Sequence, residues 1–133
     1  MGAGTFDSLQ AEFANEAFYL AFEAKDFAAM AHLWSEKTEV TCLHPGWPLL
    51  RGREPVLASW REILANPNQG QVSFYRAEVS RYAQDVFLVN CYERAGDAVM
   101  VASNWFVAED ERLRMISHQA GYCANPPPMS GEQ

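Results

Sequence analysis

The second half of the chain contains four runs with the alternating, β-branched and aromatic composition of strands, and this feature constrains the fold most. The runs cover residues 71–81, 86–94, 98–108 and 113–122. The turns between them, YAQD, AGD and EDER, are short. Because parallel pairing needs a long crossover, strands joined by such turns pair antiparallel with their neighbours. The sequence therefore predicts a four-stranded antiparallel meander.

The first half has the apolar spacing of helices. Asp7 and Gln10 form a capping-box pattern before one helix, and Asp26 can cap a second helix. Pro55 stands where the first turn of a third helix tolerates proline, and NPNQG at residues 66–70 ends that helix.

Apolar spacing also predicts the buried faces of the helices. The expected inner positions of the first helix are Leu9, Phe13, Ala17, Leu20, Ala21 and Ala24, with a second row at Phe18 and Phe22. Those of the second and third helices are Phe27, Met30 and Trp34, then Val56, Trp60, Ile63 and Leu64.

Three helices with one early strand, TEVTCLH at residues 38–44, followed by four strands form an α+β order. The curved sheet is the only large surface that can cover the helices, so we expect them to pack across one of its faces. Residues 1–133 are predicted to form a single domain. The prolines of ANPPPMSGEQ predict a flexible tail at residues 124–133.

Composition excludes some classes of partner. The formal net charge of −7 argues against a nucleic-acid or anionic-membrane surface. Arg51, Arg53 and Arg61 come nearest to a basic patch, and Glu54 and Glu62 lie among them. Arg51 and Arg53 either meet an anionic ligand or form a solvated cluster at a helix start, paired to Glu54.

Cysteine usage and apolar runs predict the compartment. Cys42, Cys91 and Cys123 have no metal-ligand spacing and apolar or aromatic neighbours, which is typical of small buried side chains in a reduced protein. No leader pattern or membrane-length apolar run is visible. We therefore expect a cytoplasmic protein.

The loop HPGWPLLRGREPVLASW, residues 44–60, carries the first candidate site residue. His44 titrates near neutrality and can accept or donate a proton; alternatively it caps loop carbonyls. Trp47 stands between Gly46 and Pro48, where it either forms the rim of an apolar pocket or plugs its mouth.

His118, in MISHQAGY, is the second candidate. Regular alternation would place it with Ile116 on one strand face and would place Met115 and Ser117 on the other. It either lines a pocket or is a satisfied interface histidine. Two histidines without a carboxylate at ligand spacing do not predict a metal site, and no cofactor is expected.

Aromatic and amide side chains complete the predicted site. Asn104 is polar within an apolar strand, and it bonds either a ligand or another buried polar group. Large apolar walls with polar tips are predicted at Trp60, Trp105, Tyr75 and Tyr92, and Phe18 is predicted as a further ligand contact. Core packing is the default expectation for Trp34 and Trp60.

Two segments resemble a known family. FYLAFEAKDFAAMAHLWSEKTEVTCLHPGWPLLRGREPVLASWREIL (18–64) and ASNWFVAEDERLRMISHQAG (102–121) are similar to a SnoaL-like subfamily of the nuclear transport factor 2-like superfamily. This superfamily also includes ketosteroid isomerase, and the resemblance covers about residues 8–122. It implies a cone with a pocket between helices and sheet, a homodimer through the outer sheet face, and apolar ligands. Where such proteins are enzymes, it implies proton transfer or hydration without a cofactor.

The resemblance carries over only in part. The isomerases' base, an aspartate before a proline, aligns with His44. Their oxyanion-hole tyrosine falls near Phe18, with Tyr19 one residue away, and their second donor falls at Ser103 or Asn104. Because such an isomerase needs a base and two donors, steroid isomerisation is not expected.

Two functions are therefore predicted. The first is binding of a small, largely apolar molecule, with Trp47 and Trp105 as walls and Asn104, His44 and His118 as polar anchors. The second is a cofactor-free isomerase, lyase or hydrolase with His44 as general base and His118 or Asn104 stabilising charge. Histidine rings within ~7 Å of each other in an open cavity would favour catalysis.

Overall fold

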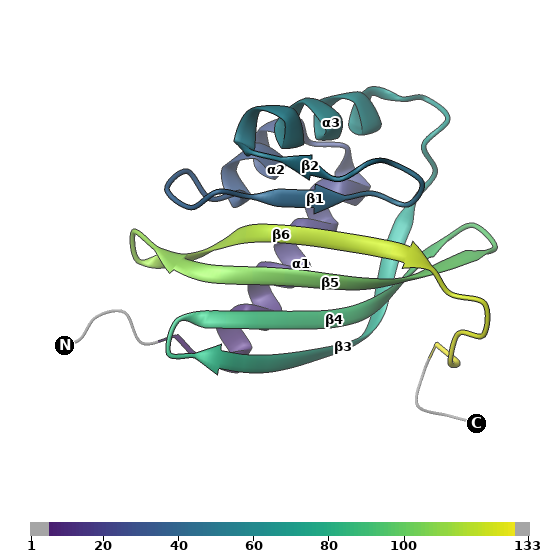
Figure 1. The fold of residues 1–133 in the computed structure, drawn as a ribbon. Coiled ribbons are helices and arrows are strands. Elements are labelled where there is room, and N and C mark those ends of the chain that lie inside the picture. The colour runs from purple at the N-terminus through teal and green to yellow at the C-terminus, as the bar shows by residue number, and fades with distance from the viewer. Residues whose placement is uncertain (1–5, 130–133) are drawn as a thin grey trace.

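The computed structural model describes residues 6–129, which form three helices on one curved sheet (Figure 1). The helices are α1 (Ser8–Ala24), α2 (Phe27–Leu33) and α3 (Arg53–Ala65). The strands are β1 (Thr41–Leu43), β2 (Leu50–Arg51), β3 (Val72–Ala83), β4 (Val86–Ala95), β5 (Ala98–Glu109) and β6 (Arg112–Tyr122). α1 crosses behind the meander strands, and α3 lies beside β1 and β2. The α+β architecture is as predicted.

The sheet has the order β2-β1-β6-β5-β4-β3. The predicted meander is confirmed, because β3 to β6 pair antiparallel in sequence order. β1 joins β6 in parallel, and the long connection that such pairing requires is residues 44–111, which contain β2, α3 and β3 to β5. β1 is shorter than expected and ends at Leu43, so His44 is the first residue of the following loop.

The capping box of α1 is confirmed, and its predicted buried face is confirmed at Phe18 and Ala21 but wrong at Leu9, Phe13 and Leu20. Asp7 accepts from the Gln10 amide, and the Gln10 side chain accepts from the Asp7 amide. Phe13 is 58% exposed. The buried residues of the helix are Ala11, Asn15, Phe18, Tyr19 and Ala21. Apolar residues surround most of this helix, so spacing alone could not identify the face that fits the concave sheet.

The strict alternation predicted for the last strand is interrupted. Trp105 pairs with Ser117 and Phe106 pairs with Met115, which leaves Ile116 as the extra residue of a β-bulge. Met115 is therefore buried like His118, although regular alternation would put them on opposite faces.

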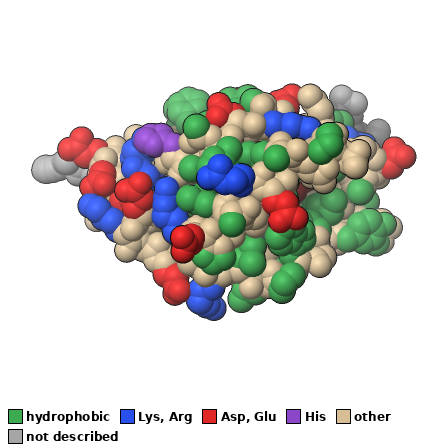
Figure 2. All heavy atoms as spheres, turned by 90° about the horizontal axis from the view of Figure 1, so that it is seen from above, with side chains coloured by type: hydrophobic (Ala, Val, Ile, Leu, Met, Phe, Trp, Pro, Cys, Tyr) green, Lys and Arg blue, Asp and Glu red, His purple; other side chains and the backbone are tan. Residues whose placement is uncertain are grey.

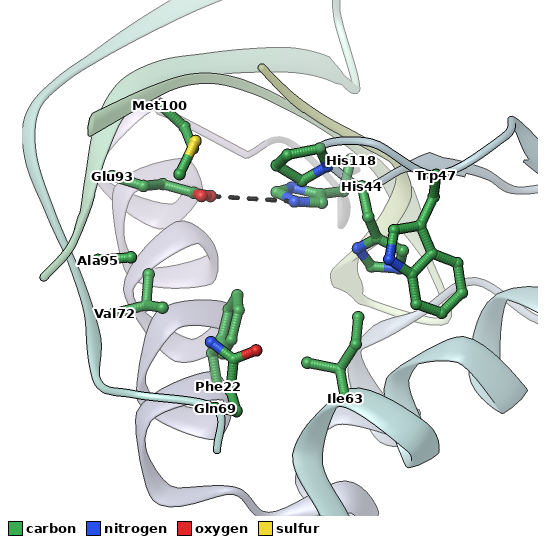
Figure 3. A pocket seen from close by; sticks show the side chains of 11 residues that line it. Phe22, His44, Trp47, Ile63, Gln69, Val72, Glu93, Ala95, Met100 and His118 are labelled. Carbon is green, nitrogen blue, oxygen red and sulfur yellow. Dashed lines mark ion pairs between the residues drawn. The ribbon is translucent and has the colours of Figure 1, made fainter. Parts of the chain in front are cut away.

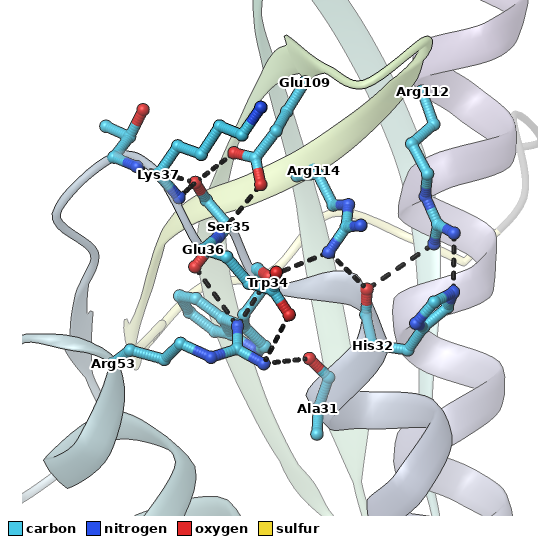
Figure 4. A network of polar contacts seen from close by, with 11 residues as sticks. Ala31, His32, Trp34, Ser35, Glu36, Lys37, Arg53, Glu109, Arg112 and Arg114 are labelled. Carbon is cyan, nitrogen blue, oxygen red and sulfur yellow. Dashed lines mark hydrogen bonds and ion pairs between the residues drawn. The ribbon is translucent and has the colours of Figure 1, made fainter.

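Arg53 has a structural role that differs from both of its predicted ones (Figure 4). Its guanidinium donates to the carbonyls of Trp34 at 2.7 Å and of Ser35 and Ala31 at 3.1 Å. These carbonyls stand at the C-terminal end of α2, where a cation satisfies unpaired acceptors. The nearby acidic partner is Glu36, at 3.7 Å, rather than Glu54.

Most of the predicted inner positions of α3 and two of the three cysteines are buried. Val56, Trp60 and Leu64 of α3 are buried as predicted. Cys42 and Cys91 are buried and Cys123 is partly exposed, all as free thiols. No helix within residues 6–129 is long and apolar enough to cross a membrane.

The predicted flexible tail, residues 124–133, lies partly outside the residues that the structure describes. Residues 130–133 are outside the described range. Before them, the carbonyls of Pro127 and Pro128 accept hydrogen bonds from Tyr75 and Arg76. This part of the tail is therefore placed against the sheet.

Candidate functional site

A pocket of about 230 Å³ lies between the sheet, α1, α3 and the loop after β1 (Figure 3). Apolar side chains make up most of its wall. The lining residues are Phe22, His44, Pro45, Trp47, Ile63, Gln69, Val72, Glu93, Ala95, Met100 and His118. Both predicted histidines thus face one cavity, and their ring centroids are 6.1 Å apart.

His44 is held from two sides. Its Nε2 lies 2.9 Å from the Ser59 hydroxyl, which donates to the Val56 carbonyl. Because that hydroxyl proton is engaged, His44 donates through Nε2–H and keeps Nδ1 as its acceptor. The ring also packs edge-on against Trp47 and Trp60, at centroid distances of 5.0 and 4.8 Å.

His118 is fixed by an amide. Asn104 donates through its NH₂ group to Asn15 at 2.9 Å and to the Tyr19 hydroxyl at 3.1 Å. Its Oδ1 therefore accepts from His118 Nδ1–H, at 2.6 Å. The free lone pair of His118 is consequently on Nε2, which faces the Glu93 carboxyl.

Glu93 supplies the only carboxyl among the pocket-lining residues. It is 5% exposed, and its Oε2 accepts from the Tyr19 hydroxyl at 2.6 Å. The same oxygen lies 3.9 Å from His118 Nε2, across the gap drawn in Figure 3. Tyr19 is also 3.4 Å from the Cys91 sulfur. One hydroxyl thus connects the carboxyl to the Asn104 and His118 hydrogen bonds.

Burial controls protonation in this pocket. It raises the pKa of Glu93 to about 7, against which the Tyr19 hydrogen bond works. Burial lowers the pKa of His44 to about 4, and burial with the neighbouring His44 lowers the pKa of His118 to about 3. Near pH 7 both imidazoles are therefore neutral, whereas Glu93 is partly ionised and can exchange a proton.

The thiols do not suit nucleophilic chemistry. Burial raises the pKa of Cys42 to about 12 and that of Cys91 to about 11. Since the thiolate is the nucleophile, both groups stay unreactive near neutrality. Within residues 6–129, no cluster of three or more His, Cys, Asp or Glu side chains is placed to hold a metal ion.

The other predicted ligand-binding residues divide into two groups. Trp47 lines the pocket, and Trp60 and Phe18 are fully buried directly behind it, with ring centroids 5.7 and 4.9 Å from His118. Asn104 contacts His118. This first group surrounds one cavity.

Trp105, Tyr75 and Tyr92 are not brought to this pocket. Trp105 packs against Tyr82 at 5.4 Å, and Tyr75 stacks on Tyr92 at 5.5 Å. Their strand positions alternate with the inward ones, so they occupy the opposite sheet face. Aromatic character alone could not distinguish the two faces.

Tyr19 and Glu93 were missed as site residues. Both Phe18 and Tyr19 are buried, so a hydroxyl donor is present on α1 where the resemblance suggested an apolar ring. The signal for Glu93 was available: in VFLVNCYER, residues 87, 89, 91 and 93 share the buried face. A single carboxylate on such a face indicates a functional group or a buried bond.

Comparison with known proteins agrees with the fold. The family model described as a SnoaL-like domain matches residues 12–124. No curated protein matches the chain.

Solved structures give further likenesses. A candidate dehydratase of the NTF2-like family from Streptomyces avermitilis is 32% identical, with a TM-score of 0.77, covering 88% of this chain and 96% of that one. A candidate calcium/calmodulin-dependent protein kinase type II association domain from Thiobacillus denitrificans is 28% identical, with a TM-score of 0.71, covering 91% and 99%. A candidate ketosteroid isomerase from Parabacteroides distasonis, 15% identical with a TM-score of 0.69 and covering 93% and 96%, shares the fold.

Proposed function

Because this chain belongs to the SnoaL-like domain family, we propose that it is a cofactor-free lyase or isomerase that moves a proton on a small, largely apolar substrate. The observation that carries the proposal is the Glu93 carboxyl, which is buried in the pocket with a pKa raised to about 7. A general acid or base works best when its pKa lies near the working pH. Glu93 therefore replaces His44 as the proposed base.

The proposed reaction begins at a carbon next to a carbonyl. Glu93 Oε2 is engaged by Tyr19, so Oε1 takes the proton while the C–H electron pair forms an enolate. In a dehydration, the enolate re-forms the carbonyl, the C–O bond of a β-hydroxyl breaks, and Glu93 returns the proton to the departing oxygen as water. In an isomerisation, Glu93 returns the proton to a different carbon.

His118 and His44 would bind rather than exchange protons in this scheme. Their lowered pKa values keep them neutral, and each has one ring nitrogen as an acceptor. His118 Nε2 faces Glu93 and would accept from the substrate hydroxyl, holding it beside the carboxyl. Asn104 would fix the required tautomer.

The pocket supports a small substrate without negative charge. Its volume of about 230 Å³ is below the roughly 300–1,000 Å³ typical of drug-sized ligands. Neither Lys nor Arg lines it, and the partly ionised Glu93 would repel an anion. A single-ring molecule thus fits better than a larger polycyclic one. The candidate dehydratase at 32% identity supports a lyase.

A panel of small cyclic β-hydroxy ketones and β,γ-unsaturated ketones tests the proposal. Dehydration of the first and isomerisation of the second both give a conjugated enone, which is followed by ultraviolet absorbance. We expect Glu93→Gln to lower turnover at least ~100-fold, the usual scale for loss of a general base. Glu62→Gln, at an exposed position of α3, is the matched control.

The titration of Glu93 provides a test that needs no substrate. Carbon-13 NMR of its side-chain carboxyl should give a pKa near 7. A pKa close to that of an exposed glutamate, or full turnover by Glu93→Gln, would contradict the proposed role.

Ligand binding without chemistry is the second candidate. The mostly apolar wall and the indole of Trp47 at its rim favour it. A ketone from the same panel that quenches tryptophan fluorescence, and is recovered unchanged after long incubation, would support binding alone.

A further inference from the structure

We propose that the outer face of the sheet carries a binding site for proline-rich segments in the polyproline II conformation, occupied here by the chain's own tail. The site consists of Tyr75 and Arg76 of β3 with Tyr92 of β4. Residues 125–129 supply the segment that fills it. This site is separate from the pocket and does not depend on the proposed reaction.

Two consecutive strand residues bind two consecutive tail carbonyls. The Tyr75 hydroxyl donates to the Pro127 carbonyl at 3.0 Å, and Arg76 Nε donates to the Pro128 carbonyl at 2.9 Å. Prolines have no N–H, so their carbonyls are the only backbone groups that can bond. Donors beside an aromatic surface are the usual means of recognising polyproline II.

Tyr75 and Tyr92 form the aromatic surface. They are cross-strand partners whose rings stack at 5.5 Å with an interplanar angle of 30°. The preceding residue, Phe74, stacks on Tyr19 of α1, so Tyr75 points to the face without helices. Tyr75 is nevertheless only 7% exposed. The tail, which runs past the end of the sheet after β6 (Figure 1), therefore contributes to its cover, since the Pro127 carbonyl bonds the Tyr75 hydroxyl.

A β-bulge brings both donors to the same segment. Side chains of adjacent residues in a regular strand point to opposite faces. The pairing register shifts between Tyr75 and Glu78, and Arg76 has a φ of 57°. That left-handed conformation is disfavoured for a residue with a Cβ and tends to persist where it serves a contact. Here it accompanies the hydrogen bond from Arg76 Nε to the Pro128 carbonyl.

The tail is suited to this site. Proline fixes φ, and a following proline restricts the preceding residue to extended conformations, so Asn125 and the three prolines lose little entropy on docking. Pro127 also lines a hollow of about 250 Å³ together with Arg76, Tyr92 and Val101. Because the tail is tethered, a proline-rich segment of another molecule must displace it.

The test opens the site in the full-length chain. The double variant Pro127→Gly/Pro128→Gly should release the tail, because glycine removes the conformational restriction. A fluorescent synthetic peptide of residues 124–133 is then titrated by anisotropy. We expect it to bind the variant at least tenfold more tightly than the wild type. A peptide carrying the same two glycines should bind neither protein.

A second variant tests the hydrogen bond that the Tyr75 hydroxyl donates. In the opened chain, Tyr75→Phe should weaken peptide binding by roughly fivefold to tenfold, the usual effect of losing one hydrogen bond. Tyr82→Phe, at an exposed position of the same strand, should leave binding unchanged. The proposal is overturned if the opened chain does not bind the peptide, binds the glycine peptide equally well, or is insensitive to Tyr75→Phe.

Discussion

At the scale of single residues, burial of titratable groups determines the chemistry of the pocket. The Glu93 carboxyl and the His118 imidazole lie 3.9 Å apart, yet near pH 7 they do not form an ion pair. His118 is neutral because burial lowers its pKa to about 3, and Glu93 is partly ionised because burial raises its pKa to about 7. Because no ion pair engages them, the Glu93 carboxyl and the His118 imidazole can interact with a neutral substrate.

The raised pKa of Glu93 predicts a pH dependence of stability. Between pH 4.5 and about 7 the folded chain keeps a proton on Glu93 that the unfolded chain releases. This contribution to the free energy of unfolding therefore falls as pH rises through that window, by on the order of 3 kcal/mol. It is constant above pH 7.

Glu93→Gln should remove this contribution, because an amide does not titrate. The measurement compares urea unfolding of the wild type and the variant between pH 4.5 and 8. The difference between the two curves isolates Glu93 from the histidines, whose lowered pKa values act in the opposite direction as pH falls below 6.5. Parallel curves would contradict the raised pKa.

His44 and Ser59 predict an energetic coupling. The Nε2–H of His44 bonds the Ser59 hydroxyl within a buried environment, so each single alanine variant leaves a partner unsatisfied. Urea unfolding of His44→Ala, Ser59→Ala and the double variant should give a coupling of about 1 kcal/mol. Purely additive losses would show that the bond does not stabilise the loop.

At the scale of elements, α1 has helical apolar spacing on a face that is exposed as well as on the face that is buried. Leu9, Phe13 and Leu20 have helical spacing but are exposed, whereas Phe18 and Tyr19 enter the space behind the sheet. Phe18 also packs edge-on against Trp60 at 5.4 Å. The buried face is distinguished by its contacts with distant elements, namely Phe18 with Trp60 of α3 and Tyr19 with Glu93 of β4.

Two phenylalanines of α1 provide a matched test. Phe18→Ala should cost about 3–5 kcal/mol of unfolding free energy, because it leaves a cavity among buried rings. Phe13→Ala should change stability by less than about 0.5 kcal/mol, because its ring is mostly in solvent. Equal losses in urea unfolding would indicate that the exposed row is covered in solution.

At the scale of the whole molecule, charge and exposed apolar side chains suggest which partners are suitable. On the face seen from the α3 side, Lys and Arg side chains are interspersed with Asp and Glu (Figure 2). With the net charge of −7, this arrangement does not favour nucleic acid. The outer sheet face instead has exposed Tyr82 and Val101.

This sheet face predicts a homodimer, as the family resemblance implied. We expect light scattering coupled to gel filtration to give twice the mass of one chain. Val101→Glu should shift the protein to the monomer, because a charge buried in an apolar interface lacks a partner. A monomeric wild type would contradict this expectation.

Local sequence determined the elements, and the tertiary structure decided the site. Caps, turns and short-range periodicity depend on neighbouring residues, so the helices and the antiparallel meander could be predicted from them. The pairing of β1 with β6, the bulge at Ile116 and the inward face of α1 depend on contacts between distant segments. Those contacts bring Tyr19, Glu93 and His118 together and bury them. Their proton affinities follow from that shared environment, which no single segment of the sequence contains.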